Sequence, residues 1–106
     1  MRDDIQRSGS ANLQKGIESV GGTLSLNPSE LRFTPHIVNV NREVVQIDIS
    51  TIASVEPART RFLGFLPLFD NAFTTSLPGG REFRFTVRER DKWVDAIRRL
   101  LEKNDA

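Results

Sequence analysis

Short segments with an apolar residue at every second position recur along this chain, and the pattern changes abruptly near the C-terminus. Thr23–Leu26 and Leu31–Thr34 alternate in this way. Val44–Ser50 and Glu82–Val87 do so as well. A period of two residues is typical of strands that bury one face. The chain is therefore predicted to build most of its core from antiparallel β-strands.

Turn-forming residues separate these segments at regular intervals. Asn27–Glu30 contains a proline that presets a turn, so residues 22–34 are predicted to form a hairpin. Pro78-Gly79-Gly80 predicts a second hairpin, because glycine tolerates the positive φ of a tight turn. Between them, strands are expected from Ile52 to about Arg61 and over Phe73–Leu77. The polar stretch Asn39–Glu43 is expected to be a connection. The total is six or seven strands.

From about Glu89 the apolar period becomes 3.6 residues, which indicates an amphipathic helix. Its apolar stripe consists of Trp93, Val94, Ile97, Leu100 and Leu101. Trp93 is expected in the core, because it begins this stripe. The predicted fold class is therefore mainly β (α+β), a barrel of about seven antiparallel strands capped by one C-terminal helix. At 106 residues the chain has the length of one domain. Residues 1–10 are expected to be a flexible tail and residues 11–106 the domain.

Composition narrows the function classes. The chain has no cysteine, no tyrosine and a single histidine, His36. Thiolate nucleophiles and zinc–thiolate sites are excluded, and the usual acid–base groups are nearly absent. His36 is expected to make a structural hydrogen bond. We therefore predict that the protein is not an enzyme and that it binds neither a cofactor nor a metal ion.

Charge and hydropathy narrow them further. The net charge is +1, and residues 57–90 hold six arginines against three acids, too mild a bias for a nucleic-acid partner. The longest apolar stretch, Phe62–Phe69, has eight residues, whereas a membrane-spanning helix needs roughly 20. The first seven residues carry both charge signs and no apolar signal core. We expect no integral membrane segment and a cytoplasmic location, with peripheral membrane contact left open.

A family resemblance rests on residues spread from Ala11 to Leu101. In order and spacing the chain resembles the GRAM domain and its small stand-alone bacterial relatives, a branch of the pleckstrin-homology superfold. The residues that carry the resemblance are Ala11–Gly16, Gly21–Leu24, Leu31–Phe33, Pro35, His36, Asn39, Ile49, Ile52, Val55, Gly79–Phe83, Phe85, Arg90, Trp93 and Ile97.

The resemblance implies a non-catalytic module that binds membrane lipid, often a phosphoinositide, or a protein segment. Phosphoinositide binders of this superfold carry several basic residues on the first strand, loop and strand. Here Ile17–Gly22 is taken as that loop, and it holds no arginine, with Lys15 nearby. A multiply charged headgroup needs several charge-assisted donors. Specific phosphoinositide binding is therefore not expected.

The most unusual segment is Arg61–Asp70, which is rich in large apolar residues but contains Gly64 and Pro67. We expect it to be a long connection between strands. In one interpretation it is exposed and inserts into anionic lipid or a protein partner. In the other it folds back and closes the barrel as core. The candidate binding residues on and around this segment are Arg59, Arg61, Phe62, Leu63, Phe65, Leu66, Leu68 and Phe69, with Arg81 and Arg84 as further anion-binding candidates.

Two functions follow from these residues. The first is peripheral association with anionic membrane lipid through loop 62–69 and nearby arginines. The alternative is protein–protein interaction through the same loop, self-association into a homo-oligomer included.

Overall fold

A computed structural model describes residues 7–16, 18–38, 42–60 and 69–105, and for residues 59–60, 69–70 and 104–105 it describes the backbone alone. Within these ranges the chain forms seven strands, one short 3₁₀ helix and one α-helix. In chain order these are β1 (Arg7–Lys15), β2 (Glu18–Leu26), β3 (Glu30–Pro35), β4 (Val45–Asp48), η1 (Ile49–Thr51), β5 (Ser54–Thr60), β6 (Phe69–Ser76), β7 (Glu82–Val87) and α1 (Arg90–Asp105).

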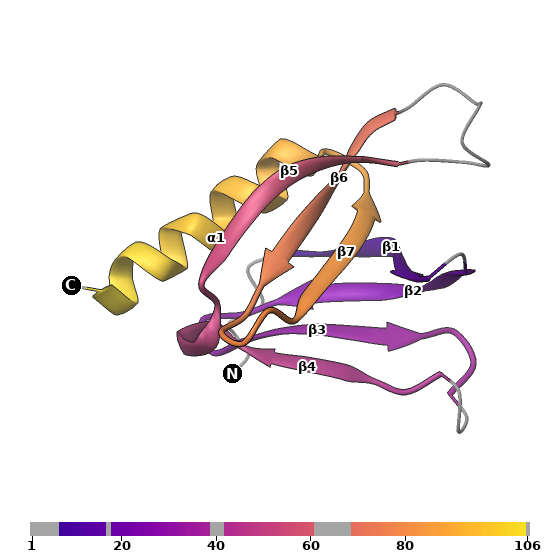
Figure 1. Cartoon of the computed structure of the whole chain (residues 1–106), viewed down its shortest axis with the longest axis horizontal. Coiled ribbons are helices and arrows are strands. Elements are labelled where there is room, and N and C mark those ends of the chain that lie inside the picture. Colours follow the sequence, from indigo (N-terminus) through magenta and orange to yellow (C-terminus); the bar gives the residue numbers. More distant parts are fainter. Residues whose placement is uncertain (1–6, 17, 39–41, 61–68, 106) are drawn as a thin grey trace.

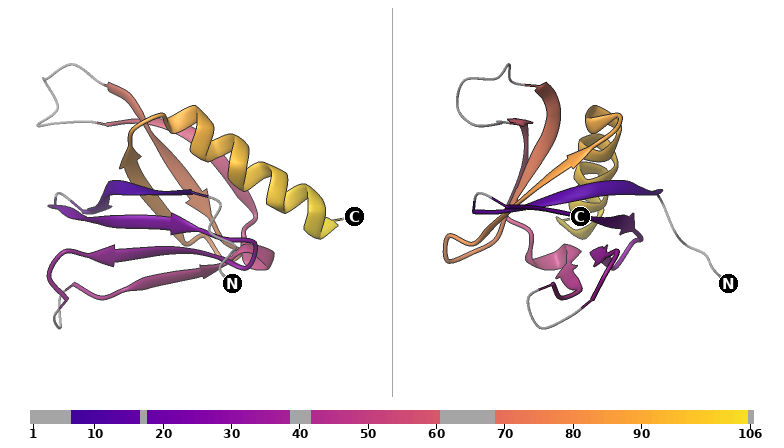
Figure 2. Two further views of the ribbon diagram at one scale, coloured as in Figure 1. Left: turned by 180° about the vertical axis from the view of Figure 1, so that it is seen from behind. Right: turned by 90° about the vertical axis from the view of Figure 1, so that its right-hand side faces the viewer.

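All seven strands belong to one antiparallel sheet with the order β4-β3-β2-β1-β7-β6-β5. The sheet curls into a half-barrel, and α1 packs against β5, β6 and η1 (Figures 1 and 2). The join between its two arms is short, because β1 and β7 pair only over Ala11–Leu13 and Phe85–Val87. The predicted fold class is confirmed.

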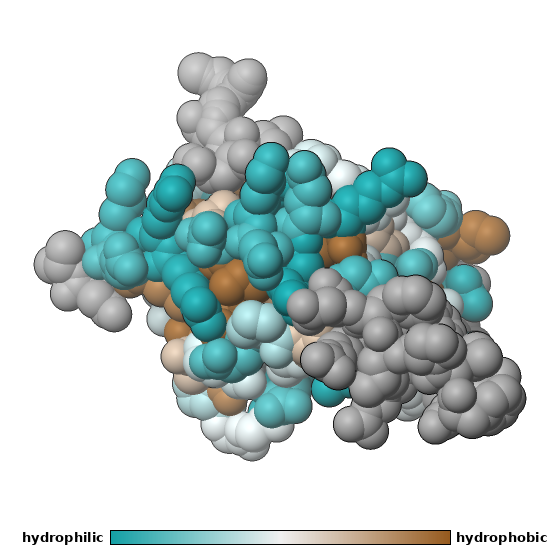
Figure 3. Space-filling model, turned by 90° about the horizontal axis from the view of Figure 1, so that it is seen from above, coloured by the Kyte–Doolittle hydropathy of each residue, from teal (hydrophilic) through white to brown (hydrophobic). Residues whose placement is uncertain are grey.

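The core lies between the concave face of the sheet and the helix. Phe33, Phe73 and Phe85 are fully buried there, and the ring of Trp93 stacks on that of Phe73 with centroids 6.5 Å apart. The prediction that Trp93 is a core residue is confirmed. Each aromatic residue comes from an alternating strand or from the apolar stripe of the helix, so both sequence periods converge on one core. The opposite side of α1, together with β5, is largely hydrophilic (Figure 3).

Both predicted turns are present. The side-chain oxygen of Asn27 accepts hydrogen bonds from the amides of Ser29 and Glu30, at 2.7 and 2.9 Å, which closes the β2–β3 turn. Gly79 and Gly80 have φ of +88° and +91°, and they form the β6–β7 turn. Only glycine adopts these angles without strain.

Three segments differ from the sequence-based expectation. Residues 7–10, expected in a tail, are part of β1 and pair with Thr23–Leu26. Residues 18–22, taken as a loop, are the start of β2, so only two residues separate β1 from β2. Both segments consist mainly of small polar residues and glycines. They could not be predicted as strands, because they show no alternation of apolar and polar residues.

The strand predicted over Val44–Ser50 ends early, at Asp48. The carboxylate of Asp48 accepts from the amide of Ser50 at 3.0 Å and caps η1. This local hydrogen bond competes with the sheet ladder and ends β4 after four residues. Phe69, expected in a loop, is the first residue of β6.

Arg90 joins the start of the helix to the β5–β6 pair. Its Nη1 donates to the carbonyl oxygens of Ala58 and Ala72, both at 2.9 Å. These two residues face each other across the strands, and the pairing register shifts directly after Ala58. The guanidinium side chain is 6% exposed. The arginine therefore satisfies carbonyl groups at a β-bulge that would otherwise be buried without partners.

Candidate functional site

Several connections between strands gather at one end of the molecule. The β1–β2 turn, the β3–β4 connection and the ends of β5 and β6 all lie at the end opposite the C-terminus of α1 (Figures 1 and 2). We call this the loop end. The predicted binding segment 62–68, with Arg61, falls outside the described residues. Its flanking strand residues, Thr60 and Phe69, lie at the loop end.

The β3–β4 connection exposes apolar side chains. Ile37 is 65% exposed, Val38 58% and Val44 40%, and they are the large apolar side chains most exposed to solvent in the described ranges. Arg42 is half-buried and Glu43 exposed on the same connection. Hydrophobic surface also emerges at this end in the space-filling view (Figure 3). The sequence-based prediction of a polar connection covers only Asn39–Glu43, and it places Val44 in the following strand.

A groove of about 980 Å³ opens beside this connection, on the open side of the half-barrel. One wall is the segment Arg42–Ile47, which includes most of β4. The other wall comes from Leu77 and Arg81–Phe83, on the β6–β7 turn and the start of β7. Apolar side chains of the inner sheet face, among them Val20 and Phe33, line it between the walls. We call this the β4–β7 groove.

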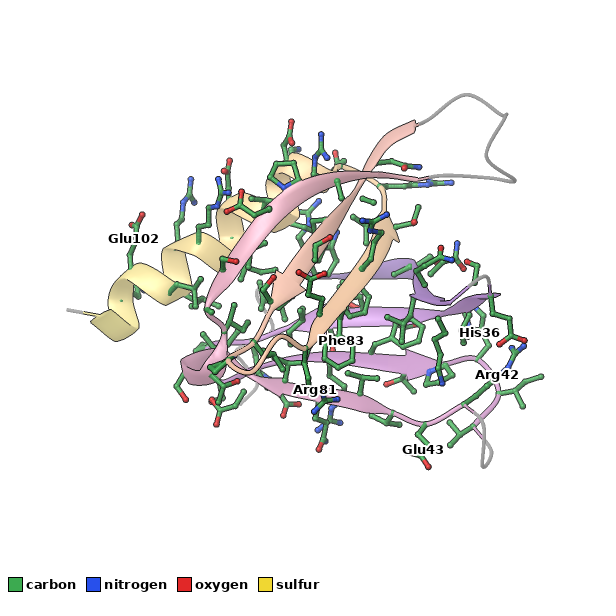
Figure 4. The ribbon with its side chains drawn as sticks, in the orientation of Figure 1. His36, Arg42, Glu43, Arg81, Phe83 and Glu102 are labelled. Atoms are coloured by element: carbon green, nitrogen blue, oxygen red, sulfur yellow. The ribbon has the colours of Figure 1, made fainter. Side chains whose placement is uncertain are left out.

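The groove carries charges of both signs. Its cations are Lys15, Arg42 and Arg81, and the carboxylates of Glu18 and Glu43 line it as well, whereas the Glu82 side chain turns toward Ser76 on the convex face. The guanidinium of Arg81 lies over the ring of Phe83, 5.2 Å from the centroid, a cation–π contact. Figure 4 shows Arg42 and Glu43 on the connection before β4, and Arg81 and Phe83 coming from the β7 side. The groove can therefore contact apolar groups and charges of both signs.

The structure separates the predicted anion-binding residues. Arg81 lines the groove, whereas Arg84 is exposed on the convex face of the sheet, opposite Thr74 of β6. The structure does not bring these two arginines together, because neighbouring odd and even positions of a strand point to opposite faces. The backbone of Arg59 lies in β5 and that of Phe69 in β6, and their side chains fall outside the described residues.

His36 lies on the convex side of the loop end. Its amide donates to the carbonyl of Gly21 at 3.1 Å, and its ring packs over the same glycine. In the described ranges no three histidine, cysteine or carboxylate side chains gather as a metal site would require. No helix in those ranges is both long enough and apolar enough to cross a bilayer.

The fold perturbs the acidity of the Glu89 carboxylate. Hydrogen bonds from Lys92 and then from Arg7, at 3.3 and 2.6 Å, hold the pKa of Glu89 below its ordinary value. Arg7 also lies over the ring of Trp93, 5.4 Å from the centroid. This cluster joins β1 to the start of α1, far from the groove, and it is an exposed structural contact.

Comparison with known proteins supports the fold through structure alone. No family model matches the chain, and no curated protein matches its sequence. Among solved structures, the C-terminal domain of an unknown protein from Leishmania infantum superposes with a TM-score of 0.73 at 16% identity, covering 92% of this chain and 83% of that one.

Two structures of the Slm1 PH domain are also similar. One, described as showing ligand binding in the non-canonical site, has a TM-score of 0.70 at 16% identity and covers 93% of this chain and 99% of that chain. The other, a complex with inositol-4-phosphate, has a TM-score of 0.66 at 15% identity, with coverages of 95% and 99%. Identities this low show the fold alone, and that fold is pleckstrin-homology-like.

Proposed function

We propose that this chain, which has the pleckstrin-homology-like fold, is a non-catalytic binding module that associates peripherally with anionic membrane lipid through its loop end. The GRAM-like branch of the superfold and a cytoplasmic location belong to the same proposal. The observation that carries it is the exposure of Ile37, Val38 and Val44 on one connection, beside Arg42. Exposed apolar groups next to cations are the usual composition of a membrane-contacting surface.

The energies favour weak, reversible binding. Each basic residue near an anionic surface contributes about 1 kcal/mol. Each large apolar side chain that becomes fully buried contributes roughly 1.5–3 kcal/mol. Ile37 and Val38 are already mostly exposed, so little native packing is lost when they enter lipid. Arg42 and Lys15 supply the electrostatic part.

Loop 62–69 is proposed to contact the same membrane. The support is positional, since the strand residues that flank it lie at the loop end together with the β3–β4 connection. Its sequence adds Phe62, Phe65 and Leu66 to the apolar surface and Arg61 to the charge. Two apolar connections at one end would together bind more tightly than either alone.

The groove charges do not favour a multiply phosphorylated headgroup. Carboxylates of Glu18 and Glu43 lie among its three cations and leave little excess positive charge for a multiply phosphorylated inositol. Inositol-4-phosphate, bound by the Slm1 PH domain, carries one phosphate. We therefore expect phosphatidylserine-type surfaces to be sufficient.

Protein interaction is the second candidate. The mixed charges of the β4–β7 groove favour it, because a groove of both signs suits a polypeptide better than a polyanion. Self-association through the apolar connections is the oligomeric form of the same candidate, and it would show as a mass that rises with protein concentration.

Co-sedimentation with vesicles tests the membrane proposal. Wild type, Val38→Asp and Phe65→Asp are compared on phosphatidylcholine vesicles with and without phosphatidylserine. Ala53→Asp is the matched control, because Ala53 is exposed just after η1, away from the loop end. We expect wild type and the control to bind only the anionic vesicles, and Val38→Asp to lose binding. If wild type binds neither type of vesicle, the membrane proposal is refuted. A Phe65→Asp chain that does not fold would identify loop 62–69 as core.

A further inference from the structure

The two edge strands of the sheet, β5 and β4, differ in whether other parts of the chain cover their outward backbone groups. At the β5 edge, Arg98 of α1 donates two hydrogen bonds to the carbonyl of Val55, from Nη2 at 2.7 Å and from Nε at 3.2 Å. Pro57 in the same strand has no N–H to offer. The helix thus covers β5 and occupies an acceptor that an added strand would need.

The β4 edge has no such cover among the residues that the structure describes. The amide of Ile49 donates to the carbonyl of Ser29 at 2.9 Å, directly beyond the paired residues Glu30 and Asp48. Hydrogen-bonded pairs in an antiparallel ladder recur at every second residue. It follows that Ile47 bonds to β3, while the N–H and C=O of Gln46 point outward.

The outward groups of β4 face an opening of suitable size and chemistry. Six consecutive residues, 42–47, form one wall of the β4–β7 groove. A strand added to β4 would lie about 4.8 Å from it. The inner sheet face beside this position is apolar, and Leu77 and Phe83 stand on the far wall. A new strand could therefore hydrogen-bond to β4 and bury alternate side chains in the groove.

The groove charges indicate what such a strand would carry. Cations and carboxylates both line the groove, with Arg42 beside Glu43 on the β4 wall and Arg81 on the far wall, while Glu18 lies between the walls. A single-sign ligand would meet repulsion in the groove, whereas a segment with one acidic and one basic side chain would find a partner for each.

We propose that β4 accepts an extended segment of a partner protein as an eighth strand. The segment has apolar residues at alternate positions, which enter the β4–β7 groove, and flanking side chains of both charge signs. Main-chain hydrogen bonds to Gln46 give affinity, and the groove gives specificity. This inference does not depend on the membrane proposal, because it uses the strand edge rather than the exposed tips of the connections.

Selection of peptides on matched variants tests the proposal. Random dodecapeptides displayed on phage are selected on wild type and counter-selected on Gln46→Pro, and the consensus peptide is then synthesised with a fluorescent label. Gln46→Pro removes the outward N–H without taking a bond from β3, and Gln46→Ala is the control that keeps the N–H. We expect at least about tenfold weaker binding for Gln46→Pro and near-wild-type binding for Gln46→Ala.

Amide hydrogen exchange on wild type gives a second measurement that does not depend on a folded proline variant. The Gln46 amide is expected to exchange quickly in the free protein and slowly with saturating peptide. The proposal is overturned if no peptide is enriched, or if enriched peptides leave the Gln46 amide exchanging freely. It is overturned equally if soluble short-chain phosphatidylserine protects the same amide while peptides do not. The same holds if that amide is already protected without peptide in samples whose mass by light scattering is that of a dimer.

Discussion

Replacing Arg90 with methionine should destabilise the fold strongly although the residue belongs to no binding surface. The change removes both 2.9 Å hydrogen bonds to the carbonyls of Ala58 and Ala72 at the bulge. Bonds from a charged donor contribute about 1.5–3 kcal/mol each. Methionine fills most of the volume and avoids the cost of a buried charge, which offsets part of the loss. The expected net change in the free energy of unfolding is about 2–3 kcal/mol.

Thermal and urea unfolding followed by circular dichroism would measure this change. For a domain of this size it corresponds to a decrease in Tm of roughly 10–20 °C. Arg99→Met is the matched control, because Arg99 is exposed on the same helix and should change stability by less than about 0.5 kcal/mol. Amide exchange should accelerate first in β5 and β6. Equal stability of Arg90→Met and Arg99→Met would refute the reasoning, since the two carbonyls would then not need the guanidinium.

Three further outcomes are expected. The hydroxyl of Thr75 is buried without a hydrogen-bond partner in the described structure, so Thr75→Val should stabilise the domain by about 1 kcal/mol in urea unfolding; a loss of stability would contradict this. A Cβ on Gly22 would overlap a carbonyl oxygen of β3, so Gly22→Ala should cost about 1–3 kcal/mol, whereas Gly9→Ala, where nothing lies within 4 Å, should cost much less. Because its folded pKa is lowered, Glu89 contributes stability above its ordinary value of 4.5, and this is lost as pH falls below it. Glu89→Gln should therefore unfold with a flatter pH dependence below 4.5, and an unchanged profile would contradict the role of its contact with Lys92.

The architecture could be predicted because its strongest elements carry clear periods. Glu82–Val87 alternates over its whole length and is β7 with the predicted bounds. Every residue of the apolar stripe that begins at Trp93 is buried in the core or packs against it. In both cases burial of one face determines the element, and the sequence records burial directly.

The candidate site was harder to predict, because exposure depends on what the chain packs against. Ile37 and Val38 are ordinary apolar residues in the sequence, and only the position of the β3–β4 connection leaves them in solvent. The one available signal was two adjacent apolar residues after His36, which fit neither a strand nor a helix pattern. Arg81 and Arg84 are three residues apart, yet strand geometry sends them to different faces of the sheet.

The unequal edges of the sheet also limit how copies of this domain can assemble. Growth of a β-fibril requires two free edges on every unit, one to join the unit below and one to receive the unit above. Here α1 and Arg98 cover β5 and leave β4 to pair outward. Strand addition at β4 therefore cannot propagate from one copy to the next, and a crowded solution of this domain would form no filaments in this way.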